Sequence, residues 1–164
     1  MELRKSFDYK KILVGLYSVM AAVFLVVGFM PAGATAQYEI SGELAIPAIG
    51  LKSGVTTLEL DNGRLNTPED LVGSFSRREN KTLLIGHAST VFDKLKDVTI
   101  GNVIVYGGTE YTVVDAVLLE KEEIKMNKVL KTEKTDTLVL MTCAGEDLGN
   151  GDATHRFMLT AKVL

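Results

Sequence analysis

From residue 38 onward, large apolar residues mostly alternate with polar or small ones. A period of two is typical of β-strands, and the segments that show it are rich in Val, Ile, Leu and Thr. The pattern predicts strands at residues 38–51, 55–60, 81–87, 102–106, 111–119, 137–142 and 156–163. Pro47 limits its part of the first strand to an edge or a bulge, because it has no N–H group to donate. We count about eight strands, which predicts an all-β fold built as a closed or nearly closed barrel.

Turn signals separate several of these strands. Asp61-Asn62-Gly63 is a turn sequence, and Gly107-Gly108 predicts the clearest hairpin of the chain. Residues 120–136 are polar and charged, which predicts an exposed loop with about one helical turn. Residues 144–155 are rich in Gly, Asn and Asp, so we expect a flexible connection there.

Two short helices are expected between the strands. Thr67-Pro68-Glu69-Asp70 combines a hydroxyl cap, Pro in the first turn and an acidic residue, a pattern that starts helices. Only one or two helical turns fit before Gly73. Ser89 is expected to cap a second short helix that runs through Leu95.

The uncharged apolar run from Ile12 to Met30 stands apart from the rest of the chain. A helix needs about 20 apolar residues to span a bilayer, and basic residues mark the cytoplasmic flank. Such residues precede the run: Arg4, Lys5, Lys10 and Lys11. The sequence therefore predicts a cytoplasmic basic tail (1–11), a transmembrane signal anchor (12–30), a linker (31–37) and an extracytoplasmic domain (38–164). The protein would be a single-pass protein of the cell membrane.

Two other interpretations of this run were weighed. Ala34-Thr35-Ala36 would suit a signal peptidase, but the apolar core of a signal peptide is usually only about 7–15 residues long. A buried core helix is disfavoured, because the run has no polar face to present to water.

Length and charge describe an ordinary globular protein. The chain of 164 residues has room for one domain. Charged residues make up 24% of it and the formal net charge is −3, without a basic cluster beyond the first residues. This balance argues against nucleic-acid binding, and the sequence predicts no cofactor and no metal site.

Cys143 is the single cysteine of the chain. An exported domain normally uses cysteines in pairs, and a lone cysteine cannot form an intrachain disulfide. Cys143 is therefore either catalytic, paired with another chain or sealed in the core.

Three side chains at predicted strand ends could together perform cysteine catalysis. Cys143 would be the nucleophile, His87 the acid/base partner, and Arg156 the group that stabilises the oxyanion. Each residue alone fits a plainer role: a buried thiol, a histidine bonded to the backbone, a surface cation. Their joint occurrence in an exported domain favours catalysis. His155 is adjacent to Arg156 and should face the opposite side of its strand. Glu146 and Asp147 should be turned to solvent.

The arrangement of these residues resembles the sortase family. The family's hallmark strand Thr-Leu-x-Thr-Cys matches Val139-Leu140-Met141-Thr142-Cys143 at four of five positions, with Val139 in place of Thr. The family's histidine falls on His87 in LIGHAST, and its arginine falls on Arg156 in HRFMLTA. Phe92, Leu95 and Gly101 follow as expected, and IPAIGL is similar to the family's first strand. The resemblance covers nearly all of residues 38–164.

The resemblance implies an eight-stranded sortase barrel with cysteine transpeptidase activity. It would cleave a C-terminal Leu-Pro-x-Thr-Gly-like sorting signal of secreted proteins between Thr and Gly. The acyl group would pass to an amine, of a peptidoglycan precursor or a pilin lysine. Thr142 would contact the peptide. Glu120, Glu122 and Glu123 are similar to loops that bind calcium in some sortases, but without oxygen-ligand spacing a solvated loop is favoured.

Two other functions stay open at the level of sequence. The domain could be an extracytoplasmic β-barrel binding module in which Cys143 is structural. It could also be a hydrolytic cysteine protease on the same scaffold. Reactivity of the thiol in the native fold separates the first from a sortase, and an amide product formed with an added amine separates the second.

Overall fold

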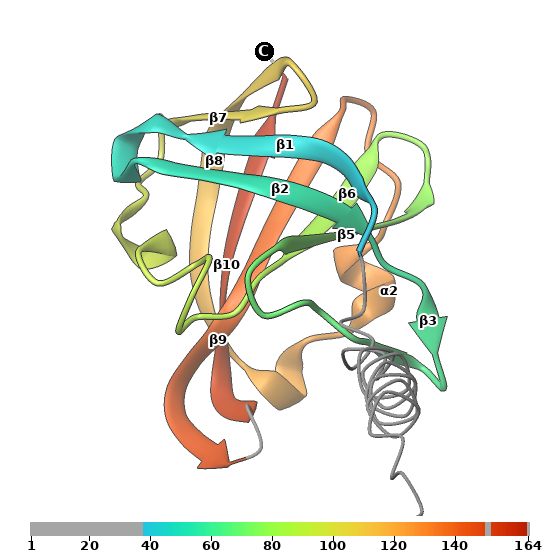
Figure 1. Ribbon diagram of the computed structural model, residues 1–164, viewed down its shortest axis with the longest axis vertical. Coiled ribbons are helices and arrows are strands. Elements are labelled where there is room, and N and C mark those ends of the chain that lie inside the picture. Colours follow the sequence, from blue (N-terminus) through green and yellow to red (C-terminus); the bar gives the residue numbers. More distant parts are fainter. Residues whose placement is uncertain (1–37, 150–151, 164) are drawn as a thin grey trace, which may run out of the picture. The chain divides into compact units, whose positions relative to one another are not determined.

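A computed structural model of the protein describes residues 38–149 and 152–163. Its strands are β1 (Ile40–Ile46), β2 (Leu51–Thr57), β3 (Leu60–Asp61), β4 (Arg64–Leu65), β5 (Val72–Arg78), β6 (Lys81–Ile85), β7 (Val103–Tyr106), β8 (Thr109–Glu120), β9 (Thr137–Gly149) and β10 (Asp152–Lys162). Among these residues, eight strands close into a barrel in the order β1-β2-β5-β6-β9-β10-β8-β7 (Figure 1). The predicted all-β barrel is confirmed.

Helical segments are short throughout the described part of the chain. They are the 3₁₀ turns η1 (Pro47–Ile49), η2 (Leu95–Asp97) and η3 (Lys121–Glu123), and the single α-helical turn α2 (Met126–Val129). None of these helices has the length and apolar character that crossing a bilayer requires. The predicted basic tail, transmembrane anchor and linker lie outside the described residues.

Both faces of the central strands β6 and β9 are buried. Leu84 and Leu140 face the main core inside the barrel and have no exposed surface. Their neighbours Leu83 and Val139 face outward, where they pack with Leu130 at the end of α2. Strands buried on both sides have continuous apolar sequences, which explains the runs TLLI and TLVLM.

The strands β6 and β9 run parallel, with Ile85 beside Met141. Parallel neighbours require a long connection, and here residues 86–136 supply it, including β7 and β8. β10 then returns antiparallel beside β9. The strands β9 and β10 extend together past the barrel as a two-stranded ribbon (Figure 1).

The predicted turns are confirmed. Asn62 and Gly63 both have positive φ in the turn between β3 and β4, and Gly107 and Gly108 do so between β7 and β8. Positive φ at both central residues is the requirement of the two-residue hairpin turn that suits twisted strands.

The predicted helix after Thr67 is wrong, because residues 66–71 form an irregular loop. In a helix the carbonyls of Thr67 and Glu69 would accept bonds from N–H groups four residues later. Here these carbonyls accept bonds from the side chains of His87 and Thr90 instead. Tertiary partners for the backbone have replaced the local helix.

The predicted helix from Ser89 through Leu95 is also wrong. Residues 88–94 form consecutive turns, and a 3₁₀ turn begins only at Leu95. The carbonyl of His87 accepts bonds from the N–H groups of both Thr90 and Phe92, which is not the regular helical pattern.

The expected flexible connection at residues 144–155 proved to be mostly strand. β9 continues through Cys143 to Gly149, and β10 begins at Asp152, so Cys143 and Arg156 lie within strands and not at their ends. Gly145 and Gly149 have positive φ, and the register between β9 and β10 shifts twice in this region. The glycines therefore mark irregularities in a long hairpin.

Two strand boundaries also differ from expectation. The first predicted strand is interrupted at Pro47–Ile49 by a 3₁₀ turn that ends at Gly50 in a left-handed conformation. β5 was not predicted, since its sequence VGSFSRR is short of large apolar residues. It is nevertheless a barrel strand, parallel to β2 and antiparallel to β6.

The barrel core predicts a stability difference between two leucines of neighbouring strands. Leu159 on β10 is 0% exposed and Leu118 on β8 is 57% exposed. Leu159→Ala should lower the free energy of unfolding by about 2–5 kcal/mol, because it leaves a cavity. Leu118→Ala should change it by less than about 0.5 kcal/mol. Urea unfolding followed by circular dichroism measures both, and equal losses would contradict the proposed core.

Candidate active site

Strand register brings Arg156 beside Cys143. The two residues are directly paired across the antiparallel strands β9 and β10. Residues paired in this way have Cα atoms about 4.5–5.5 Å apart, and their side chains point to the same face of the sheet. For these two residues it is the outer face, which also carries Val139 and Met158.

His87 reaches the same place from the other side of β9. Ile85 on β6 is paired with Met141 on β9, and His87 and Cys143 each lie two residues further along. Since alternate strand residues share a face, the continuation of both strands points His87 and Cys143 toward the outer face. His87 itself follows the last residue of β6 by two positions.

The three side chains line one cavity of about 410 Å³. Most of its other lining is apolar and comes from β3, β4, β5, β6, α2 and β9. These lining residues include Leu60, Leu65, Phe75, Ile85, Met126, Leu130 and Met141. The structure therefore joins the three predicted catalytic residues at the end of a largely apolar cavity.

A second hollow, of about 250 Å³, lies beside Cys143 and His87. Cys143 and His87 line it together with polar side chains, among them Ser89, Lys96, Asp147 and Asp152. Cys143 is half-buried, so it is not sealed in the core. The thiol and the imidazole thus line both a largely apolar cavity and a smaller hollow whose lining mixes charged and small apolar residues.

Thr142 fastens together the two segments that carry Cys143 and His87. Its hydroxyl is buried and donates a 2.8 Å hydrogen bond to the carbonyl of Gly86. Gly86 and Thr142 directly precede His87 and Cys143, so this bond holds both segments where the regular ladder ends. Thr142 also lines the cavity, and its expected contact with the peptide stays a prediction.

The ring of His87 is oriented by a backbone carbonyl. Its Nε2 lies 3.2 Å from the carbonyl oxygen of Thr67. A carbonyl can only accept, so Nε2 carries the hydrogen and donates it. The nitrogen that can take up or release a proton is then Nδ1.

Gly86 permits the close packing beneath His87. A Cβ atom at this position would lie 2.7 Å from the ring of Phe92, which is almost fully buried. The resemblance pointed to Gly86 and Phe92 by pattern, and this contact gives the physical reason.

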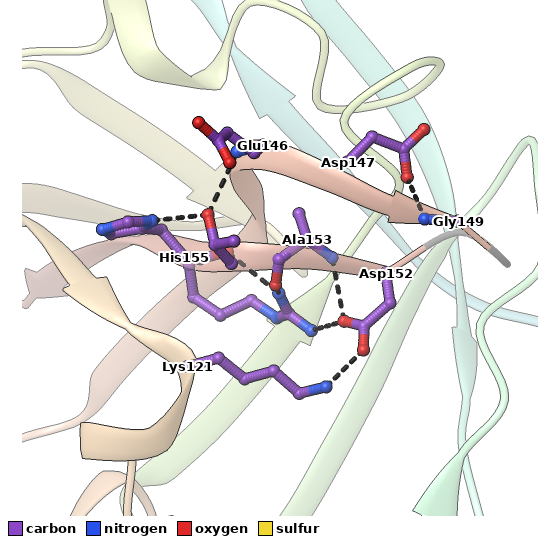
Figure 2. Close-up of polar contacts among 9 residues, drawn as sticks. Lys121, Glu146, Asp147, Gly149, Asp152, Ala153 and His155 are labelled. Atoms are coloured by element: carbon purple, nitrogen blue, oxygen red, sulfur yellow. Dashed lines mark hydrogen bonds and ion pairs between the residues drawn. The ribbon is translucent and has the colours of Figure 1, made fainter.

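The guanidinium of Arg156 is fixed by three neighbouring groups in the β9–β10 ribbon. Its Nη1 donates to the carbonyls of Ala153 and His155, each at 2.9 Å, and its Nη2 donates to Oδ1 of Asp152 at 2.6 Å (Figure 2). Asp152 also pairs with Lys121 through its other oxygen. The pKa of Asp152 is held well below its usual range by three hydrogen-bond donors. Lys121 has the largest effect, followed by Arg156 and the N–H of Ala153.

Asp152 was missed at the level of sequence. It lay in the segment interpreted as a flexible connection, where Asp is an ordinary turn residue. The available signal was its position four residues before Arg156. Residues four apart share a face of a strand, so this spacing is informative only if the segment is predicted to be a strand hairpin.

His155 lies outside the cavity that holds Cys143, as expected from strand alternation. Its Nδ1 is 2.8 Å from the hydroxyl of Thr154, and it lines a separate groove with Glu120, Glu122 and Glu146. Within residues 38–149 and 152–163, no three His, Cys, Asp or Glu side chains converge as they would around a metal ion.

Comparisons with known proteins support the family that the sequence resembles. The family model described as "Sortase domain" matches residues 44–164. A search of curated proteins found no match to the chain.

Many solved structures share the fold. Sortase C-1 from Actinomyces oris has 21% sequence identity and a TM-score of 0.60, with 76% of this chain and 72% of that chain covered. A lid mutant of sortase A from Corynebacterium diphtheriae has 21% identity and a TM-score of 0.62, with coverage of 80% and 74%. Sortase A from Listeria monocytogenes has 19% identity and a TM-score of 0.59, with coverage of 76% and 87%.

The bond between Thr142 and Gly86 predicts a difference between two conservative substitutions. Thr142→Val keeps the shape but removes the donor, so the buried carbonyl of Gly86 loses its hydroxyl partner. We expect a loss of about 1–3 kcal/mol in the free energy of unfolding. Thr142→Ser keeps the hydroxyl and should lose less. Thermal or urea unfolding measures both variants. A valine variant as stable as the serine variant would argue that the bond between Thr142 and Gly86 does not stabilise the fold.

Proposed function

Because the chain belongs to the sortase family of cysteine transpeptidases, we propose that it cleaves a C-terminal Leu-Pro-x-Thr-Gly-like sorting signal between Thr and Gly. The acyl group is then transferred to an amine. The observation that carries this proposal is the shared cavity of Cys143, His87 and Arg156.

In the first half of the proposed reaction, the thiolate of Cys143 attacks the carbonyl carbon of the substrate Thr. The carbonyl oxygen becomes an oxyanion, and Arg156 supplies fixed positive charge and N–H donors beside it. The C–N bond then breaks, and His87 as imidazolium gives its proton to the departing Gly amine. The products are a thioester on Cys143, a neutral imidazole and a free amine.

In the second half, a neutral acceptor amine attacks the thioester carbonyl. His87 takes the proton that the amine loses, and the C–S bond breaks to release the Cys143 thiolate. A new amide is formed, and the thiolate and imidazolium are restored. The Nε2–H bond to Thr67 persists through both halves, since only Nδ1 changes its protonation.

The residues that line the cavity and the smaller hollow support separate roles for these two spaces. The apolar cavity suits the Leu and Pro side chains on the acyl side of the scissile bond, since burial of apolar surface drives their binding. The smaller hollow, which Cys143 and His87 also line, then serves the departing amine and afterwards the acceptor amine.

We further propose that the domain works outside the cell membrane, anchored by residues 12–30. Its partners are secreted proteins that carry the sorting signal and an amine acceptor, either a peptidoglycan precursor or a pilin lysine. The apolar run and its basic flank support this placement.

The assignment of Cys143 predicts a complete loss of activity on its removal. The wild type should cleave at least one member of a library of Leu-Pro-x-Thr-Gly-like peptides and, with an added amine, form the amide product. Cys143→Ala should do neither, because no thioester can form. Mass spectrometry identifies both products. Cleavage that survives the substitution would reject the nucleophile, and hydrolysis unaffected by amines would favour a protease.

The two histidines of the chain provide a matched pair for the acid/base role. His87→Ala should lower kcat by about 100-fold to 10,000-fold, the usual contribution of a positioned proton donor. His155→Ala should leave kcat nearly unchanged, since His155 lies in another groove. Steady-state cleavage of the best library peptide measures both. Equal losses would argue that His155 also serves the reaction.

A further inference from the structure

Arg156 depends on its own hairpin for its position. The three bonds from its guanidinium end on Asp152, Ala153 and His155, all within four residues of it (Figure 2). Two of these partners are backbone carbonyls, which every sequence would offer. The third is the carboxylate of Asp152, and it gives the shortest of the three bonds at 2.6 Å.

Asp152 connects this hairpin to a different part of the chain. Its Oδ1 accepts bonds from Arg156 and from the N–H of Ala153, and its Oδ2 pairs with Nζ of Lys121 (Figure 2). Lys121 begins η3, directly after β8. The carboxylate therefore has donors on both oxygens, and it links the ribbon of β9 and β10 to the end of β8.

The charges of this cluster explain why a carboxylate is tolerated beside the cavity. An isolated carboxylate in the hollow next to Cys143 would oppose the negative charge that forms on an oxyanion. Here two cations, Arg156 and Lys121, pair with the one carboxylate of Asp152. The cluster of these three side chains therefore keeps a net charge of about +1. Lys121 offsets the charge of Asp152, and the positive charge of Arg156 stays available.

We propose that Asp152 is a positioning residue for Arg156, and that Lys121 supports it by neutralising its charge. Asp152 restricts the long side chain of Arg156 to the arrangement in which it lines the cavity with Cys143. This role rests on the proposed function, because it presumes that Arg156 stabilises an oxyanion. The low pKa of Asp152 is consistent with the role, since the carboxylate stays charged under working conditions.

The first experiment compares substitutions in the full chain, with the best-cleaved Leu-Pro-x-Thr-Gly-like peptide as the probe. Asp152→Ala should lower kcat/KM by roughly 10-fold to 100-fold, mainly through kcat, because the guanidinium loses its preorganised position. Asp152→Asn keeps the shape and one acceptor but loses the charge, and should lie between the wild type and the alanine variant. Lys121→Met should give a smaller loss in the same direction.

A matched control is Glu146→Gln, which removes the same charge from the same hairpin. Its carboxylate lines the separate groove and makes no bond to Arg156. Its kcat/KM should stay within roughly threefold of the wild type. An equal loss in Glu146→Gln would mean that general charge, and not the contact with Arg156, is what matters.

A second readout distinguishes positioning from general damage to the site. Alkylation of Cys143 by iodoacetamide forms a C–S bond and releases iodide without an oxyanion. Its rate should therefore be nearly the same in Asp152→Ala and in the wild type. If alkylation changes in parallel with peptide cleavage, Asp152 maintains the site as a whole and the proposal is overturned.

A double-mutant cycle with Arg156→Ala completes the test. Once Arg156 is absent, Asp152→Ala should cause no further loss, because a positioning residue acts only through its partner. If the losses in kcat/KM of the two single variants multiply in the double variant, the proposal is overturned. It is also overturned if Asp152→Ala has the same kcat/KM as the wild type. Should the alanine variant fail to fold, Asp152→Asn and the same cycle decide. If the wild type cleaves no peptide, the proposed function itself fails, and this role fails with it.

Discussion

The register of three neighbouring strands is the constraint on which the site depends. β6, β9 and β10 are paired so that Ile85 lies beside Met141 and Cys143 lies opposite Arg156. A slip of one residue in β9 would turn the thiol from the outer face to the interior of the barrel. The slip is disfavoured because Leu140 is packed in the core inside the barrel and Val139 in the outer cluster with Leu130, and close-packed sites do not accept side chains of other shapes without cost. The packing of the core thus determines where Cys143 and Arg156 lie.

Hydrogen bonds take over where the ladder between β6 and β9 ends. The regular pairing stops at Ile85, two residues before His87. Beyond that point the hydroxyl of Thr142 holds the carbonyl of Gly86, and the carbonyl of Thr67 holds the ring of His87. A functional side chain just past the end of a strand is free to meet a substrate, but it needs such substitutes for the ladder to keep its position. One of these hydrogen bonds comes from Thr67, in the irregular loop at residues 66–71, whose carbonyl accepts a bond from His87 and not from a helical N–H group.

Much of this arrangement could be predicted from sequence, and the failures have a common cause. The barrel and the Gly107-Gly108 hairpin follow from alternation and turn residues, and the grouping of Cys143, His87 and Arg156 from their residue types and the resemblance to the sortase family. The failures at residues 66–71 and 144–155 concern segments whose backbone or side chains pair with another segment instead of following the local preference. Residues 144–155 look like a loop because Gly, Asn and Asp prefer turns locally, yet pairing between β9 and β10 overrides this preference. For the same reason the link between Asp152 and Lys121, 31 residues apart, leaves no local trace.

The two spaces around Cys143 bear on why transfer could prevail over hydrolysis. In the proposed reaction the acyl peptide fills the apolar cavity, so its side chains displace water from one side of the thioester. In this proposal the nucleophile approaches through the hollow of about 250 Å³, whose lining includes Asp147, Asp152 and Lys96. Asp152 is already committed to two cations, whereas Asp147 accepts a bond from the N–H of Gly149. His87 lines the same hollow, so in the proposed reaction it is in place to take the proton that the neutral acceptor amine loses. The bound acyl peptide therefore restricts water to one side of the thioester, where the acceptor amine competes with it.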